Sequence, residues 1–374
     1  MRAAPGKGTV GHDVQMRRAI DLARRGVGTV SPNPPVGAVV VDADGAVVGE
    51  GWPPRPVDPP AEVHALGAAG ARARGATLYC TLEPCAHVGR TPPCCDAIVA
   101  AGIARVVVGT RDPNPIVDGR GIARLREAGI EVVEGALADE ATRLIEAFTR
   151  HVRTGMPFVT WKVAMSLDGR IGAADGSSRW ITGDAAREDV HRLRAANDAI
   201  VVGSGTALTD DPALTVRVAG EHRAPLRVLV DGRGRVPATG RLFDHASQTL
   251  VATTHDVDAA ARADWIATGA EVVEFPGEGG RVPLHDLFAH LGKREVQSVL
   301  LESGPTLAWS AVADDLVDRV VVYVAPLLLG GAGAPSPLGG DGFAPVGAGR
   351  RRVMGDVTTI GDDVRMEAHV HPVR

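Results

Sequence analysis

The stretch TLEPCAHVGRTPPC, residues 81–94, decides how the first part of this chain is interpreted. It follows an apolar run typical of a buried strand and leads into a helix expected over residues 93–102. Cys85 therefore comes from a loop and Cys94 from a helix N-terminus, where the helix dipole favours the thiolate. All four cysteines fall within residues 80–95, and such clustering indicates metal binding or a reactive thiol rather than a disulfide framework.

A second segment that carries chemistry is PAEVH, residues 60–64, which opens a helix expected over residues 61–74. Zinc-dependent nucleobase deaminases need three protein ligands, an open position for water, and a carboxylate that moves protons without binding the metal. Glu62 lies where that carboxylate is expected. The first part of the chain is therefore predicted to have the frame of a zinc deaminase.

Strands and helices alternate around these segments. Helices are predicted at residues 12–26, 61–74, 93–102, 122–128 and 138–153, and strands at 36–41, 46–51, 77–81, 106–109 and 131–133. Cys80 lies in one of these strands and is interpreted as a small buried hydrophobe. Elements of this length predict an α/β domain over residues 12–153, with a sheet covered by helices on both faces.

After a junction at residues 154–157 the alternation starts afresh. Strands are predicted at 158–165, 199–202, 226–230, 249–253, 271–275, 298–302 and 320–324, with helices at 185–195, 283–291 and 305–313. This pattern predicts a second α/β domain over residues 157–374. It lacks the GxGxxG of a dinucleotide-binding Rossmann unit. However, ESGPTL, residues 302–307, joins a strand to a helix whose free N–H groups suit a phosphate.

Composition narrows the class of protein. The chain carries a net charge of -5 and no basic stripe, which argues against nucleic-acid binding. It has no apolar run of about 18 residues and no apolar core behind its first ten residues, so we expect neither a membrane span nor a secretory signal. We therefore expect a cytoplasmic protein with no nucleic-acid or membrane partner.

These motifs together resemble those of one family. TLEPCAHVGRTPPC, AEVHAL (61–66), SPNPPVGAVVV (31–41) and DPNP (112–115) are similar to the deaminase half of the bifunctional riboflavin-biosynthesis deaminase–reductases. KVAMSLDGR (162–170), SRWIT (178–182), GSGT (203–206), DDPALTVR (210–217) and ESGPTL follow one another as in the reductase half. The resemblance covers nearly the whole chain and implies a cytidine-deaminase-like three-layer domain followed by a dihydrofolate-reductase-like domain.

The resemblance implies two reactions on a small pyrimidine ribosyl phosphate. A zinc-dependent step replaces an exocyclic amine of a diaminopyrimidinone with oxygen. An NADPH-dependent step then reduces the ribosyl group to a ribityl chain. Zinc and NADPH are therefore the expected cofactors, and we expect the enzyme to be a homo-oligomer.

The resemblance also assigns residues. In the first domain Cys85 and Cys94 would be zinc ligands, Glu62 would donate the proton, and Asn33 and His87 would lie near the substrate. Contacts to NADPH would come from Ala164, Trp180, Thr206, Asp210, Gly304, Pro305, Thr306 and Leu307. The second substrate site would use Ser178, Arg194, Leu214, Arg217 and Glu302. These types suit the task, because the arginine fork matches phosphate and a carboxylate accepts from ring amino groups.

The chain departs from the family at Pro60, where the family has the histidine that is its third zinc ligand. Proline has no donor atom, although it suits the first position of a helix. A second family histidine, after Trp52, is replaced by Pro53. His64 lies one turn beyond Pro60, about 5–6 Å away, and zinc–nitrogen bonds of about 2.0–2.1 Å leave little tolerance. We expect local hydrogen bonds to satisfy His64, and weak or absent zinc with little deaminase activity.

Four functions follow as alternatives. The first is the intact two-step enzyme, with an unusual zinc site completed by His64 or His87. The second is a reductase whose deaminase-like domain is kept as a structural or assembly module. The third, a deaminase of nucleic acid, is disfavoured by the acidic charge and the attached reductase. The fourth, a binding protein without activity, is opposed by the unbroken reductase motifs.

Overall fold

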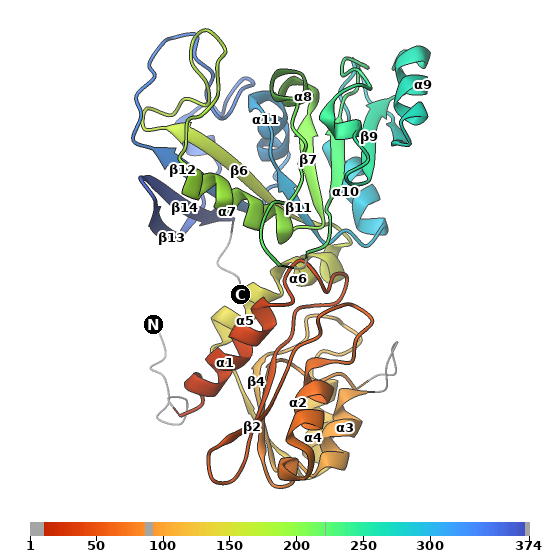
Figure 1. Cartoon of the computed structure of the whole chain (residues 1–374), viewed down its shortest axis with the longest axis vertical. Helices are drawn as coiled ribbons and strands as arrows, with labels where there is room; N and C mark the ends of the chain where they lie inside the picture. The colour runs from red at the N-terminus through yellow and green to blue at the C-terminus, as the bar shows by residue number, and fades with distance from the viewer. Residues whose placement is uncertain (1–10, 87–92, 221, 371–374) are drawn as a thin grey trace. The chain divides into compact units, whose positions relative to one another are not determined.

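The structure is a computed structural model that describes residues 11–86, 93–220 and 222–370 (Figure 1). The contacts divide the chain into two compact units, one ending at Thr154 and the other beginning at Gly155. Each unit is built on a single sheet. Among the described residues, no helix combines the length and the apolar character needed to cross a membrane.

The first unit contains a five-stranded sheet in the order β2-β1-β3-β4-β5. Its strands are β1 (Ala38–Val41), β2 (Val47–Gly51), β3 (Thr77–Leu82), β4 (Arg105–Thr110) and β5 (Glu131–Glu134). β1 runs antiparallel to β2 and β3, whereas β3, β4 and β5 are parallel. The carboxyl end of β3 leads into the cysteine segment.

Helices cover both faces of this sheet. α2 (Ala61–Ala69), α3 (Cys94–Ala101) and α4 (Arg120–Glu127) share one apolar core with the strands. α1 (Asp13–Arg24) and α5 (Ala138–Leu144) pack on the opposite face. Gly49 and Gly51 let α2 lie close to β2, because a Cβ at either position would fall 2.1 or 2.2 Å from a backbone oxygen of α2. The predicted three-layer domain is confirmed.

The single helix predicted over residues 138–153 is wrong. The structure has two helices there, α5 and α6 (Glu146–Thr154), separated at Ile145. Ile145 has φ -110° and ψ 17° and is 2 % exposed, so its side chain is buried while its backbone leaves the helical region. Helical periodicity continues through this position in the sequence and therefore does not reveal the break.

The second unit contains a nine-stranded sheet in the order β10-β9-β8-β7-β11-β6-β12-β14-β13. Its strands are β6 (Phe158–Ser166), β7 (Ala199–Gly203), β8 (Leu226–Val230), β9 (Thr249–Thr254), β10 (Glu271–Phe275), β11 (Ser298–Leu301), β12 (Arg319–Ala325), β13 (Val353–Ile360) and β14 (Asp363–His369). Neighbours from β10 to β12 are parallel, and β14 and β13 are antiparallel additions at one edge.

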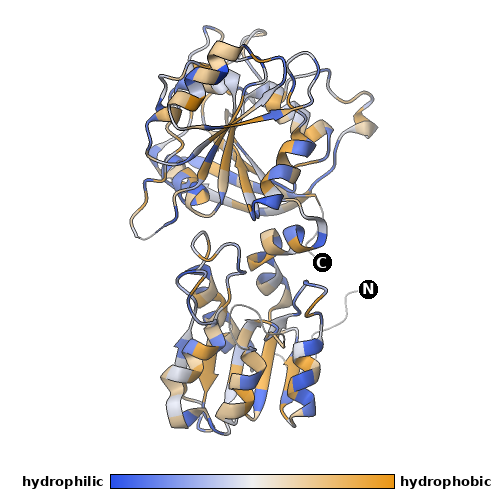
Figure 2. Cartoon of the chain, turned by 90° about the vertical axis from the view of Figure 1, so that its right-hand side faces the viewer, coloured by the Kyte–Doolittle hydropathy of each residue, from blue (hydrophilic) through white to orange (hydrophobic). Residues whose placement is uncertain are grey.

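Helices flank this sheet too, and the strands between them are largely hydrophobic (Figure 2). The helices are α7 (Asp184–Ala195), α8 (Ser204–Asp210), α9 (Ala259–Ala267), α10 (Leu284–Lys293) and α11 (Pro305–Ala313). α10 and α11 contribute to one apolar core, and Trp265 of α9 is buried in another. Because the carboxyl ends of parallel strands meet at one edge, the turns after β7 and β11 lie close together.

Candidate functional site

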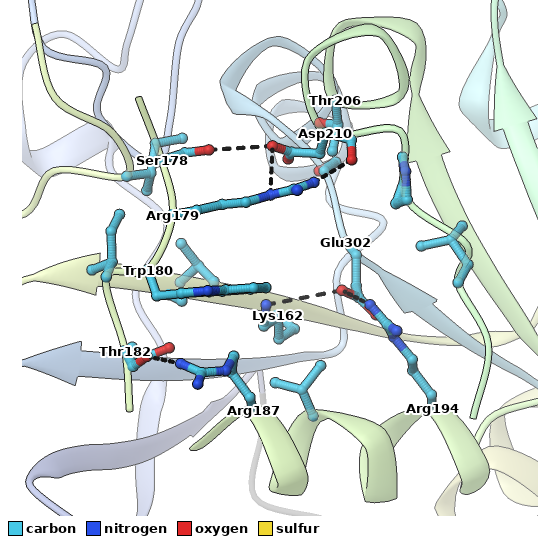
Figure 3. Close-up of a pocket in the computed structure, with 18 of the residues that line it drawn as sticks. Lys162, Ser178, Arg179, Trp180, Thr182, Arg187, Arg194, Thr206, Asp210 and Glu302 are labelled. Carbon is cyan, nitrogen blue, oxygen red and sulfur yellow. Dashed lines mark hydrogen bonds and ion pairs between the residues drawn. The ribbon is translucent and has the colours of Figure 1, made fainter. Parts of the chain in front are cut away.

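A cavity of about 590 Å³ lies in the second unit, beside β6, α7 and the turn after β11 (Figure 3). Most of the predicted cofactor and substrate residues line it: Ala164, Ser178, Trp180, Arg194, Thr206, Asp210, Leu214, Arg217, Glu302 and Gly304. Three further predicted residues, Pro305, Thr306 and Leu307, form the first turn of α11 and are not among its lining residues. The cavity thus brings together motifs that are far apart in the sequence.

An ion pair with two hydrogen bonds joins Glu302, which follows β11, to Arg194 in the last turn of α7. Nε of Arg194 lies 2.5 Å from Oε1 of Glu302, and Nη2 lies 3.0 Å from Oε2. Both side chains are largely buried. Burial alone would raise the pKa of Glu302, but the charge and hydrogen bonds of Arg194, together with the charge of Lys162, lower it to about 2. Glu302 is therefore an ionised acceptor at neutral pH.

Lys162 is a second cation beside this carboxylate. Its Nζ lies 3.9 Å from Oε2 of Glu302, and Figure 3 shows Lys162 and Arg194 both pointing toward it. Burial lowers the pKa of Lys162, and the charge of Glu302 opposes that shift. Lys162 lies in the motif at residues 162–170, which does not by itself indicate a role for it. A charged residue within the otherwise apolar β6 segment is the signal that could have identified it.

Trp180 lies at the rim of the cavity rather than in the core. It is 68 % exposed and so is not packed in the core. The guanidinium carbon of Arg187 lies 4.5 Å from the centre of its ring. Nearby, Oγ of Ser178 donates to Oδ1 of Asp210 at 3.2 Å. An exposed indole next to a hydrogen-bonded carboxylate offers both a stacking surface and an acceptor.

Arg217 is held by a histidine that sequence reasoning missed. Nε and Nη2 of Arg217 lie 3.2 and 3.0 Å from Nε2 of His191, and Nδ1 of His191 lies 3.2 Å from the carbonyl oxygen of Thr215. The carbonyl must accept from Nδ1–H, so Nε2 is free to accept from Arg217. Burial, and then the charges of Arg194 and Arg217, lower the pKa of His191. His191 and Arg194 share one helical face, at a spacing of three residues.

The turn after β11 meets the turn after β7. The N–H of Gly304 donates to Oγ1 of Thr206 at 2.9 Å, and Gly304 is the N-cap residue of α11, with Pro305 next to it. A Cβ at Gly304 would lie 3.2 Å from the same hydroxyl oxygen. The first turn of a helix has N–H groups without intrahelical partners, so this end of α11 is suited to an anion.

The first unit gathers the predicted deaminase residues Glu62, Cys85 and Cys94. Sγ of Cys94 lies 3.2 Å from Sγ of Cys85, and the backbone N–H of Cys94 donates to Sγ of Cys85 at 3.2 Å. Glu62, in the first turn of α2, is buried, and burial raises its pKa to about 7. The hydrogen bond to Cys85 and burial raise the pKa of Cys94 well above the usual thiol range.

Among the described residues, a third zinc ligand is not found beside this pair. Pro60 is the N-cap residue of α2, so it precedes the first helical residue instead of occupying that position. Residues 11–86, 93–220 and 222–370 contain no group of three His, Cys, Asp or Glu side chains that could hold a metal ion. These residues therefore do not fit a three-ligand zinc site.

The other predicted residues of this region have separate outcomes. Nε2 of His64 is buried and has no hydrogen-bond partner in the part of the chain that the structure describes, so the expectation that local hydrogen bonds satisfy it is wrong. Nδ2 of Asn33 donates to the carbonyl oxygen of Pro56 at 2.8 Å. His87 lies outside the described residues.

Glu83, two residues before Cys85, is a positioning residue that sequence reasoning also missed. Its buried carboxylate accepts from the backbone N–H groups of Asp112 at 3.2 Å, Gly119 at 3.0 Å, Gly121 at 2.9 Å and Ile122 at 3.2 Å. These contacts fasten the DPNP segment and the start of α4 to the end of β3. A buried carboxylate needs such partners, which explains its place in the motif.

Comparisons with known proteins identify the class of protein. The family model described as "RibD C-terminal domain" matches residues 157–364, and "Cytidine and deoxycytidylate deaminase zinc-binding region" matches residues 11–110. The fold and both regions thus define a bifunctional pyrimidine deaminase and NADPH-dependent reductase of riboflavin biosynthesis.

The chain belongs to the RibD family. It is 46 % identical to riboflavin biosynthesis protein RibD of Escherichia coli, over 84 % of this chain and 88 % of that protein. It is 42 % identical to RibD of Mycobacterium tuberculosis, over 85 % and 86 %. The structure of Acinetobacter baumannii RibD matches with a TM-score of 0.85 and 40 % identity, covering 96 % of this chain and 98 % of that one. The expected family, fold class, enzyme type and family cofactors, NADPH and zinc, are confirmed.

Proposed function

We propose that the reductase step is the activity this chain retains and that its deaminase unit turns over little or no substrate. The observation that carries this proposal is the contrast in donor sets. The cavity of the second unit contains paired charges and a helix N-terminus, whereas the cysteine pair of the first unit lacks a third ligand among the described residues.

The cavity fits NADPH by the chemistry of its walls. Gly304 lines the cavity, and the N-terminal turn of α11 that begins after it, at Pro305, offers the N–H groups of Thr306 and Leu307 to the pyrophosphate. Trp180 offers a stacking surface, while Ala164, Thr206 and Asp210 complete the predicted cofactor contacts. When bound, NADPH supplies the hydride. The protein contributes orientation and electrostatics.

The substrate residues divide by charge. Arg217, exposed at one side of the cavity and held by His191, is suited to the phosphate of the substrate. Glu302, held by Arg194, accepts from the amino groups of the pyrimidine, and Ser178 adds a hydroxyl. Leu214 is buried and supplies an apolar wall.

We assign the proton of the reduction to Lys162. Opening the ribose breaks the bond between its anomeric carbon and its ring oxygen, and a proton must reach that oxygen. Arg194 keeps its proton under all ordinary conditions, whereas a buried lysine can release one. Burial lowers the pKa of Lys162, which makes it the better donor of the two cations beside Glu302.

Replacement of Lys162 tests this assignment. Lys162→Gln is expected to lower kcat for substrate-dependent NADPH oxidation by roughly 10²- to 10⁴-fold, the usual contribution of a positioned acid. Lys162→Arg keeps the charge without the mobile proton, so it should fail as well. Lys293→Gln, an exposed lysine at the end of α10, is the matched control. Wild-type kcat in Lys162→Gln would refute the assignment.

For the first unit we propose that Cys85, Cys94 and Glu62 keep the frame of the deaminase site, with Asn33 and His87 near the substrate position. Metal analysis of protein purified without chelator tests this. We expect far less than one zinc per chain and little deamination of the diaminopyrimidinone substrate. Stoichiometric zinc with full deamination would show that another residue, such as His87 or His64, completes the site.

We propose that the enzyme is a homo-oligomer joined through β13. This strand is the edge of the nine-stranded sheet, and seven of its eight residues are exposed. They include Val353 at 46 %, Met354 at 59 % and Val357 at 57 %. An edge strand with exposed apolar side chains is a template for pairing with a second copy. Light scattering should give a multimer for wild type and a smaller species for Val357→Lys. A wild-type monomer would contradict the proposal.

We also propose that the two domains span residues 12–153 and 157–374, and that the protein is cytoplasmic. The cysteines at positions 80, 85, 94 and 95 form no disulfide, which is typical of a reducing compartment. Limited proteolysis should cut between residues 153 and 157 before it degrades either unit. Cell fractionation should place the enzyme with other cytoplasmic proteins.

A further inference from the structure

The Sγ atoms of Cys85 and Cys94 lie closer together than two ligands of one zinc ion would. Two thiolates on one tetrahedral zinc, with bonds of about 2.3 Å, would lie about 3.8 Å apart. A disulfide brings its sulfurs to about 2.05 Å. Sγ of Cys85 and Sγ of Cys94 lie 3.2 Å apart, which is shorter than the zinc geometry and within a small side-chain movement of a covalent bond.

The two thiols of this pair are not equivalent. Sγ of Cys85 accepts from the backbone N–H of Cys94, at the N-terminus of α3, and its thiol donates to Sγ of Cys94. Cys85 is the more accessible of the two thiols and is therefore the nucleophile. Cys85 is half-buried, whereas Cys94 is 3 % exposed. An oxidant thus reaches Cys85 first, and Cys94 is in place to attack it.

The other two cysteines provide an internal contrast. Cys80 and Cys95 are fully buried. Sγ of Cys95 lies 3.5 Å from the carbonyl oxygen of Pro84, and Sγ of Cys80 lies 3.8 Å from that of Val107. Each is therefore packed in the core against a backbone acceptor.

We propose that Cys85 and Cys94 form a redox-active dithiol that a peroxide closes to a disulfide. This inference rests on the proposal that Pro60 leaves the zinc site incomplete. The Cys85 thiolate attacks one peroxide oxygen, the O–O bond breaks, and one water leaves, giving a sulfenic acid. Cys94 attacks that sulfur, the S–S bond forms, and the S–O bond breaks to release a second water. Two thiols and one hydrogen peroxide thus become a disulfide and two waters.

Mass spectrometry of the full-length protein tests the proposal. After treatment with a small excess of hydrogen peroxide, the intact mass should fall by two hydrogen atoms and recover on addition of dithiothreitol. Trypsin cuts after Arg90, so the disulfide should link the peptide of residues 75–90 to that of residues 91–105. Cys95→Ser should still give this link and Cys94→Ser should not. A linked pair that includes Cys80 or Cys95, or stepwise addition of oxygen without linkage, would overturn the proposal.

The zinc content of the same preparation distinguishes the dithiol proposal from the proposal that Pro60 leaves the zinc site incomplete. Zinc-poor wild-type protein that closes the disulfide supports both. Zinc-poor protein whose four thiols stay reduced overturns the dithiol proposal alone. Wild-type protein with one tightly held zinc and no disulfide overturns both. Pro60→His protein loaded with zinc should resist the same peroxide dose, because a coordinated thiolate is shielded, and closure at the wild-type rate in that variant would count against the proposal.

Discussion

The cavity of the second unit and the cysteine pair of the first unit differ in how completely their polar groups are partnered. In the cavity, Glu302 has Arg194 and Lys162 as partners, and Arg217 has His191. In the first unit, the sheet, α2 and α3 are intact around the two thiols, yet the donor expected at Pro60 is missing. The fold needs apolar packing and suitable backbone angles, whereas the chemistry needs particular atoms. The chemistry of a site can therefore be lost while the fold around it is kept.

The largest effect on this difference between the two units is expected from a substitution that removes a buried partner in the cavity. Arg194→Ala leaves the buried carboxylate of Glu302 with Lys162 as its remaining partner, and loss of one member of a buried pair costs about 3–5 kcal/mol. We expect the free energy of unfolding to fall by that amount and reductase kcat/KM to fall by roughly 100-fold or more.

Arg192→Ala is the matched control on the same helix. Arg192 pairs with Glu188 at the surface, where both side chains are more than half exposed, so its loss should change stability by at most about 0.5 kcal/mol. Chemical denaturation and NADPH oxidation measure both variants. Equal effects of the two substitutions would show that the buried Arg194–Glu302 pair contributes no more to stability or activity than the surface pair.

The contrast can also be removed by repairing the first unit. Pro60→His restores the family ligand, and we expect zinc binding and a rise in deaminase activity of roughly 100-fold, with reductase activity unchanged. Pro59→His, which places a histidine one residue too early on exposed chain, should not do so. If wild type and Pro60→His deaminate equally, position 60 does not limit the site.

A smaller effect is expected at the phosphate contact. Arg217→Ala should raise the KM for the pyrimidine substrate by roughly 10- to 100-fold, because one charge-assisted contact is lost. The KM for NADPH should change little, since Arg217 is not among the cofactor residues. Steady-state kinetics with each substrate varied in turn measure both constants. A parallel rise in the two would contradict the assignment.

The smallest effect is expected at His191, which acts through Arg217. His191→Phe removes the acceptor and should raise the substrate KM several-fold while leaving kcat nearly unchanged, and His191→Gln, which keeps an acceptor, should restore it. Arg194, Arg217 and Glu302 are the charged groups that face this ring. Because burial, and then the charges of Arg194 and Arg217, lower the pKa of His191, the KM of wild type should stay constant above the usual histidine range and rise only at lower pH. A pH profile of KM that is the same in wild type and His191→Gln would contradict this role.

Much of the cavity could be predicted because its residues sit in local patterns. Glu302 and Gly304 belong to one strand-to-helix turn, and Arg194 keeps its motif context. By contrast, the role of Glu83 depends on backbone groups up to 39 residues away, and that of Lys162 on a strand far along the chain. Such contacts come from tertiary packing, which local patterns do not encode.

The fold shows the same division. The buried parallel strands were predictable from apolar runs, since both faces of the sheet are covered. β13 and β14 were not, because β13 is almost wholly exposed and lacks the alternation that marks a half-buried strand. The break at Ile145 was hidden for a related reason, since a buried isoleucine suits a helix and a turn equally well.

The position of Pro60 has a genetic consequence. Its φ of -58° and extended ψ of 158° are values that proline and histidine both adopt, so exchange between them leaves α2 undisturbed. Two of the four proline codons differ from a histidine codon by a single base. From either of these codons, we expect one mutation to restore or remove the metal chemistry of the first unit while the reductase stays under selection.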